Sequence, residues 1–387
     1  MMRSDVVIIG AGVAGLYAGY CCGISGLSFT IIDSLAKPGG QCIALYPEKK
    51  VYGVPGFHDV TACDFIDKLV PQCLAFEHTE LFGHTVEMIN TEDDGTFVVQ
   101  TRSMGHAKKP LCISARYVII AAGICDMKPN IPATIAGLQD ISESSDFVQS
   151  CCMKIDMYKG KDVAIAGGGD SAVDFALSII PIAKSVILIH RRDKLTCSAV
   201  KLRSISEWER SGKLKLILKT NISELTERGN ERVVTITRDD GNRPLSKPSE
   251  SELLLGGTEH RSGVYLEVHE HSSTGSTQQE ADCGGFGMRS NESKLKVDHI
   301  IFCYGFVARC HKLTWLHALA PDIKDGMIAV DVNTMETSVK NCYAIGDVVI
   351  YANKSKNIVP CFFEADRAVR MIKSKGADAV HKDKRST

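Results

Sequence analysis

The sequence contains two copies of a short glycine pattern, and each copy follows an apolar run. In the first copy, Val6–Ile9 precede Gly10, Gly12 and Gly15, which have the spacing GxGxxG. A continuous apolar run of this length predicts a strand buried on both faces of a parallel sheet. The first glycine suits a tight turn, the second lets the backbone approach a pyrophosphate, and the third lets a helix pack on the strand.

The residues after the first glycine pattern complete a dinucleotide-binding unit. A helix that starts in the pattern presents its dipole and free N–H groups to phosphates. The next apolar run, FTIID, ends in Asp33. A carboxylate at that place accepts hydrogen bonds from a ribose diol. We therefore expect Gly10, Gly12, Gly15 and Asp33 to bind a dinucleotide; the alternative is a glycine-rich helix start in a plain α/β core.

The second copy of the pattern lies in KDVAIAGGGDSA. Gly167, Gly169 and Ala172 occupy the three slots, and alanine is tolerated in the last one. Asp170 and Ser171 stand at the start of the expected helix, where their side chains could cap it. The predicted nucleotide contacts in this loop are Gly167, Gly168, Gly169, Asp170 and Ser171.

The residues after the next apolar run, SVILIH, indicate which nucleotide the second loop prefers. His190 takes the slot that Asp33 has in the first copy, and Arg191 and Arg192 follow it. A carboxylate would repel a 2′-phosphate, whereas a guanidinium binds one through paired hydrogen bonds. The sequence therefore predicts NADP(H) over NAD(H) at Arg191 and Arg192; the alternative is a solvated strand end.

Two nucleotide loops in one chain require two dinucleotides, or one loop has lost its ligand. A flavin and a nicotinamide form a natural pair, because a hydride passes between them once they are held in contact. Alternating residues in 213–236 predict strands that complete the second sheet. The expected fold class is α/β, with two Rossmann-like three-layer domains.

Two further motifs carry a family resemblance. YVIIAAG at 117–123 and NCYAIGDVV at 341–349 resemble segments of the two-dinucleotide flavoprotein family that includes thioredoxin reductase, and the likeness runs almost end to end. It implies a discontinuous FAD-binding domain, 1–125 and 307–387. It also implies an NADP-binding domain at 126–306 with an inserted polar loop at about 239–297. The helix FEADRAVRMI, 363–372, is expected to start near the flavin ring.

One branch of that family fits best. PGGQCIALYPEKKVYGVPGF, 38–57, resembles the signature of the thioredoxin-reductase-like ferredoxin–NADP(+) reductases, from which Val51 and Gly53 depart. The resemblance implies that Tyr52 stacks near the isoalloxazine ring. It also implies a C-terminal extension, including Ser386, that covers the flavin of the partner subunit in a homodimer, although Arg385 replaces the usual histidine. The remaining flavin contacts implied are Asp33, Gln41, Tyr46, Val86, Met127 and Asp347.

Two adjacent cysteines raise the question of a thiol relay. The CxxC of thioredoxin reductases would align with Ser150 and Met153, and Cys151 and Cys152 lie between those slots. Neighbouring Cα atoms are about 3.8 Å apart, whereas an ordinary disulfide needs about 4.4–6.8 Å. A bridge between Cys151 and Cys152 would store strain, so we expect two small apolar residues there and no redox centre.

The resemblance implies electron transfer between NADPH and ferredoxin through FAD, in either direction. A flavin accepts two electrons as hydride and can release them singly to an iron–sulfur protein. Three alternatives stay open: a thiol-disulfide reductase that uses Cys151–Cys152, an NADPH oxidase or diaphorase, and a nucleotide-binding scaffold without turnover.

Composition limits the other functions. The 387 residues carry a net charge of −1, so the chain has no overall attraction to nucleic acid or anionic membranes. It has no apolar run of the roughly 18 residues that a membrane span needs, and we do not expect its first residues to act as a secretory signal. We therefore expect a cytoplasmic protein with most of its 15 cysteines reduced. No Cys/His cluster has zinc spacing, so we expect no metal.

Overall fold

The computed structural model describes residues 1–51, 53–104, 110–125, 130–142, 144–149, 155–238, 291–305, 310 and 313–383, with side chains as far as residue 376. These residues form two compact units. The first unit contains Met1–Asn130 and the chain from Gly305 onward. The second unit contains Ile131–Ser150 and Ile155–Tyr304. Along the described residues, the chain therefore leaves the first unit after Asn130 and is back in it at Gly305.

The first unit is built on a seven-stranded sheet with β1 (Met2–Ile9) at its centre. β1 pairs in parallel with β2 (Phe29–Asp33) on one side and with β8 (Leu111–Ile120) on the other. The strand order is β5-β2-β1-β8-β7-β6, and β19 pairs with the end of β8. The other strands of this sheet are β5 (His78–Phe82), β6 (His84–Thr91), β7 (Phe97–Ser103) and β19 (Cys342–Ala344).

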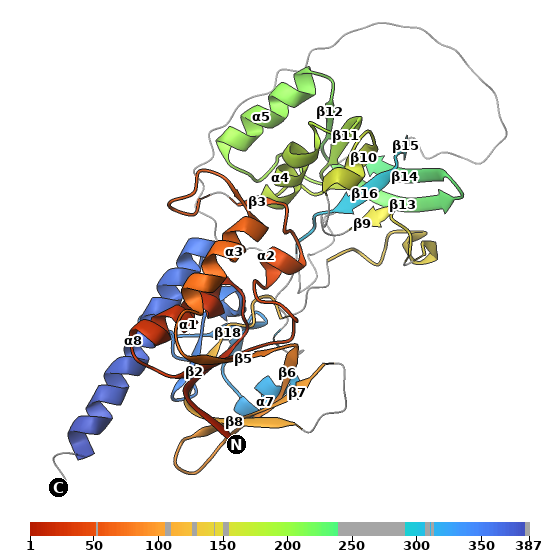
Figure 1. Ribbon diagram of the computed structural model, residues 1–387. Coiled ribbons are helices and arrows are strands. Elements are labelled where there is room, and N and C mark those ends of the chain that lie inside the picture. The colour runs from red at the N-terminus through yellow and green to blue at the C-terminus, as the bar shows by residue number, and fades with distance from the viewer. Residues whose placement is uncertain are drawn as a thin grey trace, which may run out of the picture. The chain divides into compact units, whose positions relative to one another are not determined.

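Both faces of this sheet are covered, as the apolar run of β1 predicts. Successive side chains of a strand point to opposite faces. Val6 and Ile8 pack in one cluster with α1, α3 and α8, which Figure 1 shows side by side. Val7 and Ile9 pack in a second cluster with residues of α7. The helices are α1 (Val13–Ile24), α3 (Ala62–Cys73), α7 (Thr314–Leu319) and α8 (Ile358–Asp383).

Short elements connect these layers of the first unit. β3 and β4 form an antiparallel pair, and β17, β18 and β20 form a small three-stranded sheet. A one-turn helix, α2, starts after Gly40, and a 3-10 turn, η4, follows β19. Their bounds are α2 (Gln41–Ala44), β3 (Lys50–Val51), β4 (Val60–Thr61), β17 (Ile323–Lys324), β18 (Met327–Ala329), η4 (Gly346–Val348) and β20 (Val349–Ile350).

The second unit contains a five-stranded parallel sheet in the order β12-β11-β10-β16-β9 (Figure 1). Residues 163–166 of its central strand are fully buried, in keeping with a strand covered on both faces. The elements are β9 (Val148–Gln149), β10 (Asp162–Ala166), α4 (Asp170–Ile179), β11 (Ser185–Ile189), α5 (Ala199–Arg210), β12 (Leu214–Ile217) and β16 (His299–Phe302), with 3-10 turns η1 (Leu138–Asp140) and η2 (Ile155–Tyr158).

Two sequence predictions about the second unit need correction. Of the strands expected in 213–236, only β12 joins the parallel sheet. β13 (Thr220–Arg228) and β14 (Glu231–Arg238) form a separate antiparallel sheet with β15 (Glu292–Lys296). A two-residue turn joins β13 to β14, so local pairing satisfies their backbone groups without the parallel sheet. The polar loop predicted at 239–297 is too long, because β15 lies within it; 239–290 fall outside the described residues.

The helix predicted at 363–372 also begins earlier than expected. α8 starts at Ile358, so residues 363–372 lie in its interior and do not form an N-terminus. Pro360 falls in the first turn of α8, where a missing backbone N–H costs no helical hydrogen bond. The proline therefore permits a helix start that an apolar pattern alone does not reveal.

A buried carboxylate fixes the turn that follows β19. Glu364 of α8 is fully buried. Its Oε2 accepts a hydrogen bond from the backbone N–H of Gly346 at 2.7 Å. Its Oε1 accepts one from the hydroxyl of Tyr351 at 2.6 Å and pairs with the ammonium of Lys354, whose side chain is 5% exposed. The next residue in the turn is Asp347, so this network sets the place of a predicted flavin contact.

We expect Glu364→Gln to lower the free energy of unfolding by about 3–5 kcal/mol, because the buried ammonium of Lys354 loses its counter-charge. Urea denaturation monitored by circular dichroism measures this change. The control is Asp366→Asn on the same helix, which breaks an exposed pair with Arg370 and should cost no more than about 1 kcal/mol. Equal effects of the two substitutions would contradict the role of Glu364.

Candidate functional site

The first glycine loop leaves no room for side chains at two of its three glycines. Gly10 has a φ of +109°, and a Cβ there would lie 2.3 Å from the carbonyl oxygen of Ala121. A Cβ on Gly15 would lie 1.8 Å from the carbonyl oxygen of Gly10. The loop therefore passes directly against the end of β8, and α1 packs directly on the loop. This geometry matches the roles predicted for the first and third glycines.

The second glycine of the loop, Gly12, has open space where its side chain would be. A Cβ there would meet only the Cα of Gly40, at 3.8 Å. Gly12 is the N-cap of α1, and no side chain caps the helix. By contrast, Thr61 and Ser198 cap α3 and α5 by accepting from backbone N–H groups. The first N–H groups of α1 are thus available to an anion such as a pyrophosphate.

Asp33 joins the end of β2 to the glycine loop. Its Oδ2 accepts a hydrogen bond from the Ala11 N–H at 2.6 Å, and its Oδ1 accepts one from the Leu35 N–H at 2.8 Å. Burial raises the pKa of this carboxyl, against the lowering effect of the two backbone hydrogen bonds. Two carboxylate oxygens offer about four acceptor positions, so capacity remains for a ribose hydroxyl.

Gln41 and Asp347 lie in contact, although 306 positions separate them in the sequence. The Gln41 amide donates to Asp347 Oδ2 at 3.0 Å. A Cβ on Gly123, just after β8, would lie 3.4 Å from the same amide nitrogen. Backbone from 38–40 reaches the loop as well, since the Gly39 N–H donates to Ala11 O at 2.8 Å. The described structure therefore assembles Gln41 and Asp347 beside the strand ends that carry the first glycine loop.

The other predicted flavin contacts have different settings. Tyr46 is half-buried, and burial raises the pKa of its hydroxyl. Val86 lies on β6 and is buried in the same cluster as Ile32. Its contact with a flavin stays a prediction. Three predicted residues, Tyr52, Met127 and Ser386, lie outside the described residues, as do Cys151 and Cys152.

The groups of the first unit fit a flavin dinucleotide chemically. The uncapped start of α1 offers N–H donors for phosphates, and Gly12 and Gly40 leave the approach without side chains. Asp33 and Asp347 offer carboxylate oxygens to hydroxyl groups. Contact of these residues with FAD stays a prediction.

The second glycine loop repeats this geometry in the second unit. Gly167 has a φ of +145°, and a Cβ there would lie 2.7 Å from Cys303 O and 3.1 Å from the Cβ of Ala172. Gly169 is the N-cap of α4, again without a side-chain cap. The caps expected from Asp170 and Ser171 are therefore wrong, because both residues lie inside the helix. Asp170 instead pairs with Lys201 at 2.6 Å, and Ser171 is exposed.

The residue in the slot of Asp33 behaves differently in the second unit. The ring of His190 lies against Gly168, where a Cβ would come within 2.3 Å of Cγ. His190 Nε2 is buried and has no hydrogen-bond partner within the described part of the chain. Arg191 and Arg192 follow with exposed side chains. The second loop thus presents two guanidinium groups where the first presents a carboxylate.

Burial lowers the pKa of His190, and the charges of Arg192 and Arg191 lower it further. The unfolded chain takes up a proton on this histidine near pH 6.5, while the folded chain resists protonation. The free energy of unfolding should therefore fall as the pH drops below about 6.5 towards the folded-state pKa.

We expect His190→Asn to flatten this part of the stability profile, measured by urea denaturation between pH 7.5 and 5. The control is His58→Asn, which replaces a histidine whose side chain is fully exposed. If His190→Asn and the parent protein had the same pH profile, the lowered pKa of His190 would not be the cause of the loss of stability at low pH.

Sequence reasoning missed the residues that hold the site in place. Glu364 is the charged residue on an otherwise apolar helix face that includes Cys361, Ala365 and Ala368. A charged residue within this apolar pattern is the feature of the sequence that could have identified Glu364. Thr196 was missed too: its N–H donates to Gly168 O at 2.7 Å and so steadies the second loop. No pattern in the sequence points to Thr196.

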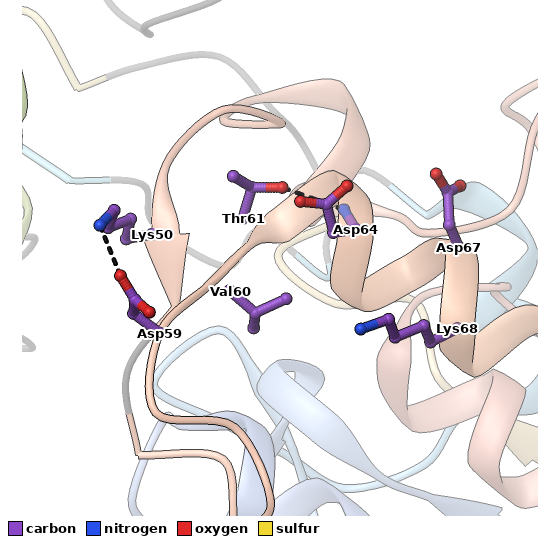
Figure 2. Close-up of a pocket in the computed structure, with 7 residues that line it drawn as sticks. All are labelled: Lys50, Asp59, Val60, Thr61, Asp64, Asp67 and Lys68. Carbon is purple, nitrogen blue, oxygen red and sulfur yellow. Dashed lines mark hydrogen bonds and ion pairs between the residues drawn. The ribbon is translucent and has the colours of Figure 1, made fainter.

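The first unit also has a surface hollow that lies among other residues. Figure 2 shows it between β3, β4 and the start of α3, with Lys50 directed to Asp59 at 2.5 Å. Within the described residues, its lining contains none of the predicted cofactor contacts. The glycine loops, and not this hollow, carry groups that suit a dinucleotide.

Within the described ranges, no three His, Cys, Asp or Glu side chains are grouped so that they could hold a metal ion. In the same ranges, every helix is too short or too polar to cross a bilayer.

Sequence comparison finds relatives over most of the chain. The family model of pyridine nucleotide-disulphide oxidoreductases matches residues 4–255. The ferredoxin–NADP reductase of Rickettsia canadensis is 30% identical over 383 residues, which cover 98% of this chain and 96% of that protein. The ferredoxin–NADP reductase of Neorickettsia sennetsu is 31% identical over 376 residues, covering 96% and 93%.

Solved structures share the fold at low identity. The thioredoxin reductase of T. acidophilum superposes with a TM-score of 0.72 at 19% identity, covering 97% of this chain and all of that one. The bacillithiol disulfide reductase of Bacillus cereus gives 0.69 at 17% identity, with 97% and 100% coverage. These structures confirm the predicted fold class, two Rossmann-like domains of the thioredoxin-reductase type.

The sequence relatives bear on the predicted activity. Their names confirm the predicted enzyme class, a ferredoxin–NADP(+) reductase, and the cofactor prediction of FAD and NADP(H) agrees with the matched family. The family model covers well over half of the chain, and relatives at 30% identity cover nearly all of it. The chain belongs to the pyridine nucleotide-disulphide oxidoreductase family.

Proposed function

We propose that this protein transfers electrons between NADPH and a ferredoxin through bound FAD. The observation that carries the proposal is the pair of glycine loops with uncapped helices, which differ at one slot. The carboxylate of Asp33 accepts a hydrogen bond from the first loop. In the second unit, the exposed Arg191 and Arg192 come after the strand that corresponds to the one ending in Asp33. Such a pair suits two different dinucleotides, one of which carries a 2′-phosphate.

The first unit is the proposed FAD-binding domain. Backbone N–H groups at the start of α1 face the pyrophosphate, and Asp33 accepts from the adenosine ribose. Gln41 and Asp347, already joined at 3.0 Å, contact the ribityl and ring portions. The residues of this site that lie outside the described ranges, Tyr52, Met127 and Ser386, belong to the same proposal.

The second unit is the proposed NADP(H)-binding domain. Gly167, Gly168 and Gly169 take the pyrophosphate at the start of α4, with Asp170 and Ser171 in the first turn. Arg191 and Arg192 bind the 2′-phosphate through charge-assisted hydrogen bonds. His190, held neutral by burial, adds no negative charge to that position.

Ferredoxin is the proposed partner because relatives that match nearly all of the chain are named for it. When bound, FAD supplies a centre that takes two electrons from NADPH and releases them singly. The chain's own part is to hold the two dinucleotides and to exclude competing reactions. Ser150 and Met153 occupy the places of a CxxC pair, so the proposed route uses no thiol relay. A homodimer and a cytoplasmic location stay predictions of the sequence.

We expect the double substitution Arg191→Ala and Arg192→Ala to raise KM for NADPH roughly tenfold to a hundredfold, because charge-assisted hydrogen bonds to the 2′-phosphate are lost. KM for NADH should stay nearly constant, as NADH has no such phosphate. Steady-state kinetics with both nucleotides measures the difference. Arg210→Ala, exposed at the end of α5, is the control. Equal losses with NADPH and NADH would count against the assignment.

The double substitution Cys151→Ser and Cys152→Ser tests whether electrons pass from the flavin to ferredoxin without a thiol intermediate. We expect NADPH-driven reduction of a [2Fe–2S] ferredoxin to stay within about twofold of the parent rate, since no thiol takes part. Stopped-flow absorbance under anaerobic conditions measures flavin bleaching and ferredoxin reduction separately. If flavin bleaching persists in the variant and ferredoxin reduction stops, the thiol-disulfide alternative is correct.

The oxidase alternative is tested on the parent protein. It is correct if the parent protein reduces oxygen faster than it reduces ferredoxin.

A further inference from the structure

Two cysteines that are far apart in the sequence meet in the first unit. Cys125 follows β8, and Cys310 precedes α7. Their Sγ atoms are 3.6 Å apart, a thiol–thiol hydrogen bond. Cys310 is fully buried, whereas Cys125 is half-buried and so reaches solvent. A disulfide needs an S–S distance of about 2.05 Å, so the sulfur atoms must approach by about 1.5 Å.

Backbone contacts hold both cysteines in position. Cys125 has a φ of +63°, a left-handed conformation that is uncommon outside glycine, and its N–H donates to Ala122 O at 3.1 Å. The Cys310 N–H donates to Gly326 O at 3.2 Å, and its carbonyl accepts from the Leu313 N–H at 2.9 Å. The meeting of the two sulfur atoms is therefore set by the fold on both sides.

The chemistry of the pair differs from that of the other thiols. A hydrogen bond from Cys125 lowers the pKa of Cys310 despite its burial. The other cysteines of the described ranges whose pKa shifts all shift upward, chiefly through burial, and Cys342 and Cys361 are examples. A thiolate is the nucleophile in disulfide chemistry, so this pair is better prepared for oxidation than the buried thiols elsewhere.

We propose that Cys125 and Cys310 are a modification site that a hydroperoxide converts to a reversible disulfide. The solvent-accessible Cys125 passes its proton to the Cys310 thiolate, and its sulfur attacks the peroxide; an S–O bond forms, the O–O bond breaks, and the leaving oxygen takes the proton from Cys310 and departs as water or alcohol. Cys310 thiolate then attacks Cys125 Sγ; the S–S bond forms, the S–O bond breaks, and hydroxide leaves as water. Two thiols lose two electrons and two protons, and the peroxide gains them.

This disulfide would link the two segments of the first unit that flank the second unit in the sequence. Along the described residues, the chain passes from the first unit to the second between Asn130 and Ile131, and returns between Tyr304 and Gly305. Cys125 and Cys310 stand just outside these two crossings, so the disulfide closes a loop that contains the entire second unit. The pair also lies near predicted flavin contacts, since Cys125 Sγ is 3.6 Å from Gly123 O and Cys310 Sγ is 4.0 Å from the carbonyl oxygen of Val348, the residue after Asp347.

Peptide mapping tests the proposal directly on the full-length protein. Protein reduced with dithiothreitol and desalted is treated with limiting hydrogen peroxide, blocked with N-ethylmaleimide and digested with trypsin and endoproteinase Asp-N. The sequence then places Cys125 alone in peptide 117–125 and Cys310 alone in peptide 310–312. We expect mass spectrometry to find these two peptides joined, at least about tenfold above any other pair, and separated again by dithiothreitol.

Matched variants and a stability measurement complete the test. Cys125→Ser and Cys310→Ser should abolish the joined peptides, whereas Cys112→Ser, on β8 and half-buried, should not. Peroxide should raise the unfolding midpoint of the parent protein but not that of Cys125→Ser, because the loop that the disulfide closes is long. Absence of the joined peptide in the parent, or coupling of Cys125 to Cys151 or Cys152, would overturn the proposal. Neither result depends on electron transfer to ferredoxin, so failure here leaves the proposed function untouched.

Discussion

The site depends on close backbone packing that only glycine permits. At Gly10 and Gly15 a single Cβ would collide with carbonyl oxygens, so these positions let the end of β1, the start of α1 and the end of β8 converge. That convergence points the uncapped start of α1 towards the carboxyl ends of the parallel strands, where ligands of open α/β sheets bind. The Gln41–Asp347 pair and the Asp33 carboxylate are then brought to the same edge by strands that flank this point.

The chain uses this packing twice and changes one slot. In the first unit, Asp33 bonds to the backbone of the glycine loop and adds negative charge. In the second unit, His190 packs its ring on Gly168 and two arginines follow. The fold is kept while the electrostatics are inverted, which is the physical basis for proposing two different nucleotides. The buried Glu364–Lys354 pair serves the first unit in another way, by fixing the turn before Asp347 from the side of α8.

The sequence predicted those features that are local and periodic. The buried runs of β1 and β10, the glycine spacing, and the acid or histidine after the second strand each lie within a short window, and the structure has them there. Features that depend on distant partners could not be predicted. The counter-charge of Glu364, the separate sheet of β13 and β14, and the meeting of Cys125 with Cys310 all rest on tertiary contacts. The early start of α8 was missed because Pro360 usually marks a helix end, yet it is tolerated in a first turn.

The proposed function requires that the first unit retains a flavin that a phosphorylated nicotinamide reduces. The most direct measurement is the visible absorbance of the purified full-length protein before and after anaerobic addition of NADPH, with NADH in parallel. We expect a yellow protein with about one flavin per chain, bleached by NADPH and far more slowly by NADH. A colourless protein that does not retain added FAD, or a flavin that both nucleotides bleach equally fast, would contradict it.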